Sequence, residues 1–235
     1  QMCIRDSYQD GDQKLTNAIT SGTGPDIIFE GPERIVGNYA REGLMVDLSD
    51  LWENGGSDIP EGISSVSQLD GPYYMYPLSV AAHCMAINYD VFEAAGALQY
   101  IDEETRTWTT DNFVKAMEAV RDAAAAGTVN VATPGIIYCG AQGGDQGTRA
   151  LVNNLYSDYY VNEDGTSYLA NSENNVKALK LLQDMVNNGS MSANASFAAA
   201  DELQAFANQT CAVSFCWNYS NYTQYAEQTQ FCLLY

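Results

Sequence analysis

Residues 12–43 read DQKLTNAITSGTGPDIIFEGPERIVGNYAREG and carry helix and strand signals in alternation. Leu15, Ala18 and Ile19 share one helical face, and the glycines and proline at 22–25 end this first helix. The short apolar run at 26–29 is typical of a strand buried on both faces of a parallel sheet. A second helix is expected over 33–42. Helix, tight turn, buried strand and helix in this order predict an α/β fold.

Turn and periodicity signals extend this pattern toward the C-terminus. Residues 55–71 are loop-rich, and Asp70-Gly71 before Pro72 predicts a hairpin turn whose second arm is 73–76. The further elements expected are a short helix around Leu51 and Trp52, a small-residue strand at 79–88, helices at 89–95, 149–156 and 201–208, and a strand at 210–217.

Two longer helices have clear apolar faces. The first has Thr110 or Asp111 as its expected N-cap and places Phe113, Met117 and Val120 on one side. The second is capped by Ser172 and runs to Gly189. Its expected apolar stripe consists of Val176, Leu179, Leu182, Met185 and Val186.

The charge of the chain limits its partners. Ten Lys and Arg stand against thirty Asp and Glu, a formal net charge of −20. A field of this sign repels phosphate backbones and anionic lipid surfaces, so nucleic acid is not expected as a partner. No apolar stretch approaches the ~20 residues of a membrane span.

Cysteine and histidine usage gives no sign of a metal site. The six cysteines form no C-x-x-C pair and are accompanied by one histidine, His83. We therefore expect no zinc and no cofactor, and we expect buried free thiols, with one disulfide pair left open. His83 lies among small apolar residues, which favours a structural histidine over a general base.

Two further segments contain residue types that are used in catalysis or phosphate binding. Glu103-Glu104 resembles an acid pair but lies in a polar loop, which favours a solvated turn. The glycine-rich loop at 143–147 lacks the lysine of a phosphate-binding loop and the spacing of a dinucleotide fingerprint. We interpret it as a loop whose backbone approaches a small ligand.

Residues 215–219, Phe-Cys-Trp-Asn-Tyr, are the most informative for function. Trp217 at the end of a strand, beside Asn218 and Tyr219, offers a flat apolar face together with hydrogen-bonding groups. A pyranose presents C–H groups on one face and hydroxyls at its rim, so this combination suits a sugar. The alternative is a core tryptophan at a sheet edge.

Several motifs occur in a recognisable order. They are LTNAITSG and PDIIF at 15–22 and 25–29, YAREGL at 39–44, GPYYMYPL at 71–78, INYDVF at 87–92, TWTTDNF at 107–113 and AFANQTCAV at 205–213. In this order they resemble family 1 extracellular solute-binding proteins, the carbohydrate receptors of bacterial ABC importers. The sequence departs from the family pattern at Tyr89, Thr110 and Gln209-Thr210, which leaves the type of ligand open.

The resemblance implies a two-lobe α/β fold of the periplasmic-binding-protein type II, present here in incomplete form. Residues 1–78 would be part of lobe 1, 79–82 the first crossover and hinge, 83–229 lobe 2, and 230–235 the start of the return crossover. Residues 1–7 resemble a translated adapter and are expected to be non-native, and the chain is expected to be a fragment that lacks both ends of the protein.

The resemblance also implies the site and its function. A sugar or oligosaccharide would be captured between the lobes by hinge closure, without catalysis or cofactor. The implied ligand-binding residues are Glu30, Glu33 and Arg34 in lobe 1, with Gln142, Asp145, Trp217, Asn218 and Tyr219 in lobe 2. The implied partners are a carbohydrate and ABC permease subunits, and the protein would be an extracellular or periplasmic monomer anchored as a lipoprotein. The alternatives are a secreted carbohydrate-active hydrolase, with Glu30 and Asp145 as its acid pair, and a sugar-sensing or adhesion protein.

Overall fold

The computed structural model describes residues 11–140, 145–162, 166–229 and 231–234. The chain divides into two units, Gln1–Val80 and Ala81–Tyr235, and each is described by itself. Gln142 belongs to the glycine-rich loop and lies outside the described residues.

Unit 1 is built from short helices around a small apolar core. Its helices are α1 (Gly11–Thr20), α2 (Pro32–Arg34), the π-helix η1 (Ile35–Ala40), α3 (Ser49–Gly55) and α4 (Glu61–Val66). Ile35, Val36 and Tyr39 of η1 form the centre of the core, and Leu15 and Ile19 of α1 pack against them. The predicted helices at 12–20 and 33–42 are therefore present, the second as α2 and η1.

Two predictions for unit 1 are wrong. Residues 26–29 form no strand, and Ile27 and Phe29 are 87% and 78% exposed. The apolar run has no neighbouring strand within the described residues of unit 1, so its backbone has nothing to pair with. The stretch expected to be loop-rich contains α4, which starts directly after Pro60.

The predicted turn at Asp70-Gly71 is confirmed, but the expected second arm at 73–76 forms no strand beyond an isolated bridge at Tyr73. Gln68 and Tyr73 form an antiparallel bridge across it. Asp70 and Gly71 have φ angles of 54° and 116°, in the region that aspartate and glycine adopt most readily. The turn places Tyr73 on Trp52, with ring centroids 4.1 Å apart.

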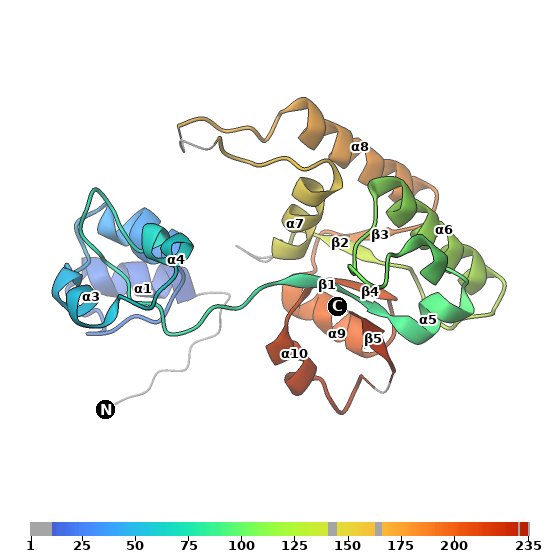
Figure 1. Cartoon of the computed structure of the whole chain (residues 1–235), viewed down its shortest axis with the longest axis horizontal. Coiled ribbons are helices and arrows are strands. Elements are labelled where there is room, and N and C mark those ends of the chain that lie inside the picture. The colour runs from blue at the N-terminus through green and yellow to red at the C-terminus, as the bar shows by residue number, and fades with distance from the viewer. Residues whose placement is uncertain (1–10, 141–144, 163–165, 230, 235) are drawn as a thin grey trace. The chain divides into compact units, whose positions relative to one another are not determined.

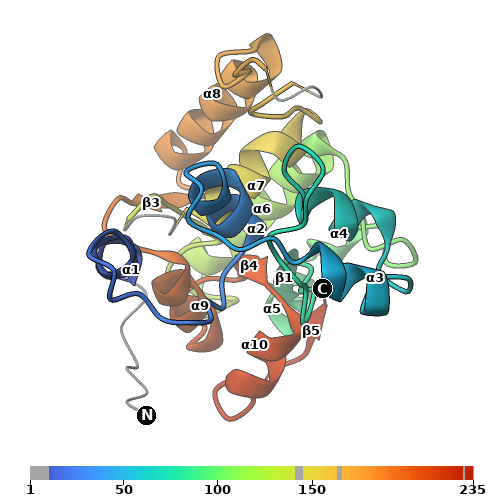
Figure 2. The same ribbon diagram turned by 90° about the vertical axis from the view of Figure 1, so that its left-hand side faces the viewer.

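Unit 2 is a layered α/β structure. Its central sheet has the strand order β4 (Val213–Trp217), β1 (Cys84–Asn88), β5 (Leu233–Leu234), all antiparallel neighbours, and a second sheet pairs β2 (Ile136–Tyr138) with β3 (Ser192–Asn194) in parallel. The helices are α5 (Tyr89–Ala94), the 3-10 helix η2 (Leu98–Tyr100), α6 (Thr110–Ala125), α7 (Gln146–Leu155), α8 (Glu173–Asn187), α9 (Ala199–Ala207) and α10 (Tyr219–Gln224). Within this unit, α6 and α7 lie on one side of β1 and β4, and α9 and α10 lie on the other (Figures 1 and 2).

The two faces of the central sheet are covered by separate apolar clusters. One face is buried by side chains of α5, α6, α7 and α8, among them Phe92, Met117, Leu151 and Leu182. The other is buried mainly by α9, through Ala205, Phe206 and Ala207. The sheet is therefore buried on both sides.

The helix signals of unit 2 are largely confirmed. Ser172 caps α8 and accepts a hydrogen bond from the backbone N–H of Asn175. The cap of α6 is Thr109, one residue before the expected positions, because its hydroxyl accepts the N–H of Asn112 at 3.2 Å. The predicted stripe of α8 is only partly buried, since Val176 and Leu179 are each 53% exposed.

Candidate functional site

The strand ends of unit 2 meet at one edge. β1 and β4 are antiparallel, and Cys84 at the start of β1 pairs with Trp217 at the end of β4. β2 runs parallel to the chain that leads into β4, as shown by the bridge between Thr133 and Cys211. Carboxyl ends of strands in open α/β sheets are where ligands bind. This edge is therefore the candidate site within unit 2.

The start of α7 is held at the end of β2. The Tyr138 hydroxyl accepts the backbone N–H of Gly147 at 3.2 Å, and the Thr148 hydroxyl donates to the Tyr138 carbonyl at 2.8 Å. Burial raises the pKa of the Tyr138 phenol well above its ordinary value, so the hydroxyl is neutral. A side chain at Gly147 would overlap Tyr138 and Phe215, so glycine is needed for this close approach.

Trp217 does not present its ring at this edge. Its side chain is 0% exposed and lies between Phe206 and Tyr225, at centroid distances of 5.2 and 6.2 Å. The indole Nε1 has no hydrogen-bond partner within the described part of the chain. This burial favours the alternative of a core tryptophan over the predicted ring that stacks on a sugar.

Asn218 and Tyr219 leave the strand at the edge itself. The Asn218 side chain caps α10 by accepting the Asn221 N–H at 3.0 Å, and its Nδ2 lies 3.4 Å from Nε2 of His83. The Tyr219 side chain is 73% exposed. Tyr219 therefore offers an exposed aromatic ring at this edge, and the amide of Asn218 and the imidazole of His83 lie at the same strand end.

Asp145 precedes α7 and forms an ion pair with Arg149, with 3.0 Å between Oδ1 and Nε. Both side chains are partly exposed, so water weakens their attraction. The carboxylate retains oxygen atoms that can accept hydrogen bonds from a ligand.

Two of the three predicted residues of unit 1, Glu30 and Arg34, form a local ion pair. Glu30 Oε2 lies 2.6 Å from Nη1 of Arg34, and its other oxygen accepts the Gly31 N–H at 3.0 Å. Glu33 is exposed in the first turn of α2. Glu30 and Arg34 thus form an ion pair that has no net charge.

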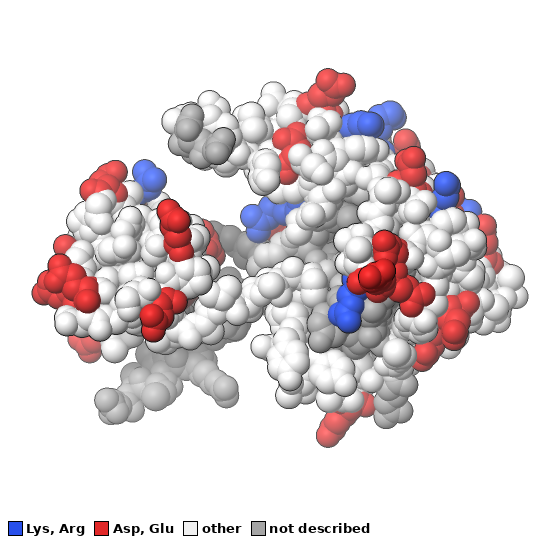
Figure 3. All heavy atoms as spheres, viewed as in Figure 1, with Lys and Arg blue, Asp and Glu red and all other residues white. Residues whose placement is uncertain are grey.

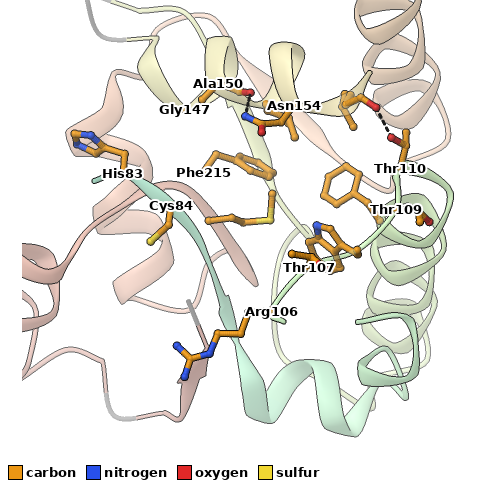
Figure 4. A pocket seen from close by; sticks show the side chains of 15 residues that line it. His83, Cys84, Arg106, Thr107, Thr109, Thr110, Gly147, Ala150, Asn154 and Phe215 are labelled. Atoms are coloured by element: carbon orange, nitrogen blue, oxygen red, sulfur yellow. Dashed lines mark hydrogen bonds between the residues drawn. The ribbon is translucent and has the colours of Figure 1, made fainter. Parts of the chain in front are cut away.

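Unit 2 also contains a cavity of about 340 Å³ (Figure 4). Its wall combines apolar side chains from Met85, Trp108, Phe113, Leu151, Leu155 and Phe215 with polar ones that include His83, Arg106, Thr107 and Asn154. The cavity shares His83 and Gly147 with the candidate edge. Its size falls in the range of small-ligand sites. Sequence reasoning missed it because its walls come from segments that are far apart in the chain.

His83 and the Glu103-Glu104 pair lie at the surface of unit 2. His83 is exposed and contacts Asn218 rather than a carboxylate among its described neighbours. Glu103 and Glu104 are exposed in the turn that follows Asp102. No group of three or more metal-ligating side chains occurs within the described ranges.

The surface reflects the composition. Acidic side chains are scattered over the face shown in Figure 3, and the described lysines and arginines form no continuous patch there. None of the helices formed by the described residues is both long and apolar enough to cross a membrane.

The chain is similar to several known proteins. The chain matches the family described as "Bacterial extracellular solute-binding protein" over residues 4–231. It is 33% identical over 84 residues to the diacetylchitobiose binding protein DasA of Streptomyces coelicolor, a match that covers 36% of this chain and 20% of DasA.

Solved structures match most of the chain. An ABC transporter solute-binding protein from Thermotoga lettingae, bound with alpha-D-tagatose, gives a TM-score of 0.76 at 17% identity and covers 93% of this chain and 54% of its own. An ABC substrate-binding protein from Listeria monocytogenes, in complex with cycloalternan, gives a TM-score of 0.70 at 21% identity. This match covers 97% of this chain and 56% of the Listeria chain. The chain thus spans about half the length of these structures.

These matches confirm the predicted fold class, the two-lobe α/β fold of periplasmic binding proteins, of which this chain contains a part. The family match covers nearly the whole chain, far beyond the individual motifs. The chain belongs to the family of bacterial extracellular solute-binding proteins.

Proposed function

We propose that this chain is part of the substrate-binding protein of an ABC transporter, which captures a sugar or oligosaccharide between its two units by hinge closure. The observation that supports this most is the edge of unit 2, where strand ends, the start of α7 and the exposed Tyr219 converge in a member of a solute-binding family. In this proposal residues 79–82 are the hinge and 230–235 begin the return crossover.

The proposed contacts follow from the groups available. Tyr219 supplies a ring face for stacking on C–H groups, and Asn218 and Asp145 supply an amide and a carboxylate for hydroxyls. Gln142 remains a proposed contact from the same loop as Asp145. Glu30, Glu33 and Arg34 are the proposed contacts from unit 1. Trp217 acts in this proposal by supporting the strand end from the core.

A carbohydrate is the proposed ligand class. DasA is named for diacetylchitobiose, and the two structural relatives hold tagatose and cycloalternan. Sugar hydroxyls pair well with amide and carboxylate oxygens, and both are present at the edge.

The proposal excludes turnover. Glu30 and Asp145, which the hydrolase alternative would use as its acid pair, each form an ion pair with an arginine of their own unit. The protein would deliver its ligand to ABC permease subunits as an extracellular or periplasmic monomer, anchored as a lipoprotein, and would not bind nucleic acid. A sugar-sensing or adhesion role is the second candidate, and the neighbouring genes would distinguish it.

The test is a thermal-shift screen of the full-length protein against mono- and oligosaccharides. A ligand that binds only the native state raises its stability by about 2.7 kcal/mol at a hundredfold excess over Kd. A saccharide that shifts the midpoint is then incubated with the protein and recovered. Unchanged saccharide on chromatography supports the receptor, whereas shortened product supports the hydrolase. A cooperative melt that no saccharide shifts would contradict the proposal.

A further inference from the structure

A buried glutamate lies directly behind the candidate edge. Glu202 of α9 is 0% exposed. Its Oε1 accepts the backbone N–H of Phe215 at 2.7 Å, and its Oε2 lies 2.9 Å from the hydroxyl of Ser214. Both partners belong to β4, within five residues of Tyr219. The carboxyl group therefore holds the middle of the strand whose end leads into Asn218 and Tyr219.

The surroundings of Glu202 favour its neutral form. The titratable groups near it are Tyr138 of β2, Cys211 and Cys216 before and within β4, and Tyr225 after α10. None of them can carry a positive charge. Burial is the main cause that raises the pKa of Glu202 to about 8, against the two hydrogen bonds, which lower it. Burial therefore favours the protonated form of this carboxyl group.

The hydrogen bonds of Glu202 fall on an irregularity of β4. Ala86 pairs with Ser214 and Cys84 pairs with Trp217, so Phe215 and Cys216 stand opposite the single residue Met85. This is the arrangement of a β-bulge, in which one extra residue lacks a partner in the neighbouring strand. Phe215 donates its N–H to Glu202 at this position.

The bulge changes the face to which the strand end turns. Val213 and Phe215 pack into the cluster on the α6 and α7 side, but Trp217 packs into the cluster on the α9 side. In a regular strand these three alternate residues would lie on one face. The bulge thus reverses the alternation just before Asn218 and Tyr219.

We propose that Glu202 is a positioning residue for ligand binding, which holds the bulge of β4 and so sets where Asn218 and Tyr219 lie. The effect on ligand binding rests on the proposed function, whereas the effect of Glu202 on the bulge of β4 does not. Loss of the carboxyl group removes both hydrogen bonds to β4. Ionisation keeps both acceptors but places a charge in the buried site, and the cost of that charge favours movement of the side chain toward water. The strand end then moves, and the ligand contacts weaken.

The experiment compares three variants of the full-length protein. Glu202→Gln keeps an acceptor for Phe215 and a donor for Ser214 without a titrating group. Glu202→Leu removes both bonds, and Asp201→Asn is the matched control, an exposed carboxylate on the same helix. We expect affinity for the screened saccharide at pH 7 to fall about fivefold to tenfold in Glu202→Leu, the loss of a buried hydrogen bond. Glu202→Gln and Asp201→Asn should stay within about twofold of the parent, since no hydrogen bond of β4 is lost.

The pH profile separates positioning from simple packing. Because the folded pKa is raised, the contribution of Glu202 is present at low pH and is lost as pH rises through about 8. Parent affinity should therefore decline between neutral pH and pH ~9, and Glu202→Gln should remove that decline while Asp201→Asn keeps it.

A second readout does not depend on a ligand. The backbone amide resonances of Asn218 and Tyr219 should shift with a midpoint near 8 in the parent and stay constant in Glu202→Gln. Resonances that titrate alike in both proteins, or Glu202→Leu that folds and binds as the parent does, would overturn the inference. If Glu202→Leu does not fold, the inference is tested by the pH comparison and by Ser214→Ala, which removes one of the two hydrogen bonds of Glu202 and should weaken saccharide binding in the same direction. A parent that binds no saccharide counts against the proposed function alone, since the resonances still test Glu202.

Discussion

Replacing Trp217 by alanine should lower the stability of the protein strongly, because its indole packs in the core and does not contact the ligand directly. The indole has no exposed surface and packs against Phe206 and Tyr225, so its removal leaves a cavity between α9 and β4. Substitutions of this kind cost about 3–5 kcal/mol. For a protein of this size we expect a fall in melting temperature on the order of 10 °C.

The matched comparison is Tyr219→Ala, two residues further on. Its ring is exposed, so the unfolding free energy should change by no more than about 0.5 kcal/mol. Loss of a stacked ring should weaken saccharide binding by about 1 kcal/mol, or roughly fivefold. Tyr222→Ala is the control, because this tyrosine is also exposed on α10 and is not a proposed contact.

The assay combines urea denaturation, followed by far-ultraviolet circular dichroism, with titration calorimetry on the screened saccharide. Trp217→Phe adds a finer test, since it keeps an aromatic ring and removes a buried donor that has no partner among the described residues. We expect it to retain more stability than Trp217→Ala. The reasoning is refuted if Trp217→Ala unfolds at the parent urea concentration and loses saccharide binding, because the indole would then contact the ligand.

Three further predictions test other parts of the structure. Ser172→Ala should lower the unfolding free energy by about 1 kcal/mol, since it removes the N-cap of α8 and the bond to Asp158, whereas Ser65→Ala, in an exposed turn of α4, should leave denaturation curves unchanged. Asp145→Asn should reduce saccharide affinity by a few-fold and leave the melting temperature nearly unchanged, because its ion pair with Arg149 is partly exposed; a large loss of stability would contradict this. Gly147→Ala should lower both stability and affinity, since a methyl group there collides with Tyr138 and Phe215, and calorimetry that finds neither change would show that α7 can shift away from β2 without loss.

Local signals in the sequence were enough for most of the helices and for the turn at Asp70-Gly71, although they missed α4 and α10. The cap at Ser172, the periodic faces of α6 and α8 and the turn at Asp70-Gly71 depend on residues a few positions apart, whose hydrogen bonds and spacing are properties of the chain itself. The ordered motifs predicted the protein family correctly, because they extend over most of the chain. Asn218 and Tyr219 could likewise be selected as site candidates from their place after a predicted strand.

Elements that need a distant partner could not be predicted in this way. Residues 26–29 have the composition of a buried strand, but a strand exists only where another backbone receives its hydrogen bonds. Val176 and Leu179 continue the apolar period of α8, yet burial requires a neighbour that covers them.

Trp217 shows the difference most clearly. Alternation along β4 assigns it to the face of Val213 and Phe215, but the bulge opposite Met85 turns it toward α9. Glu202 holds this bulge and Phe206 covers the Trp217 ring. Both residues lie more than ten positions before Trp217 in the chain, and only the packing of α9 against β4 brings them there. The sequence therefore determined the residues that are available at the strand end, whereas tertiary packing decided which of them faces solvent, because burial is a property of contacts between segments and not of any one segment.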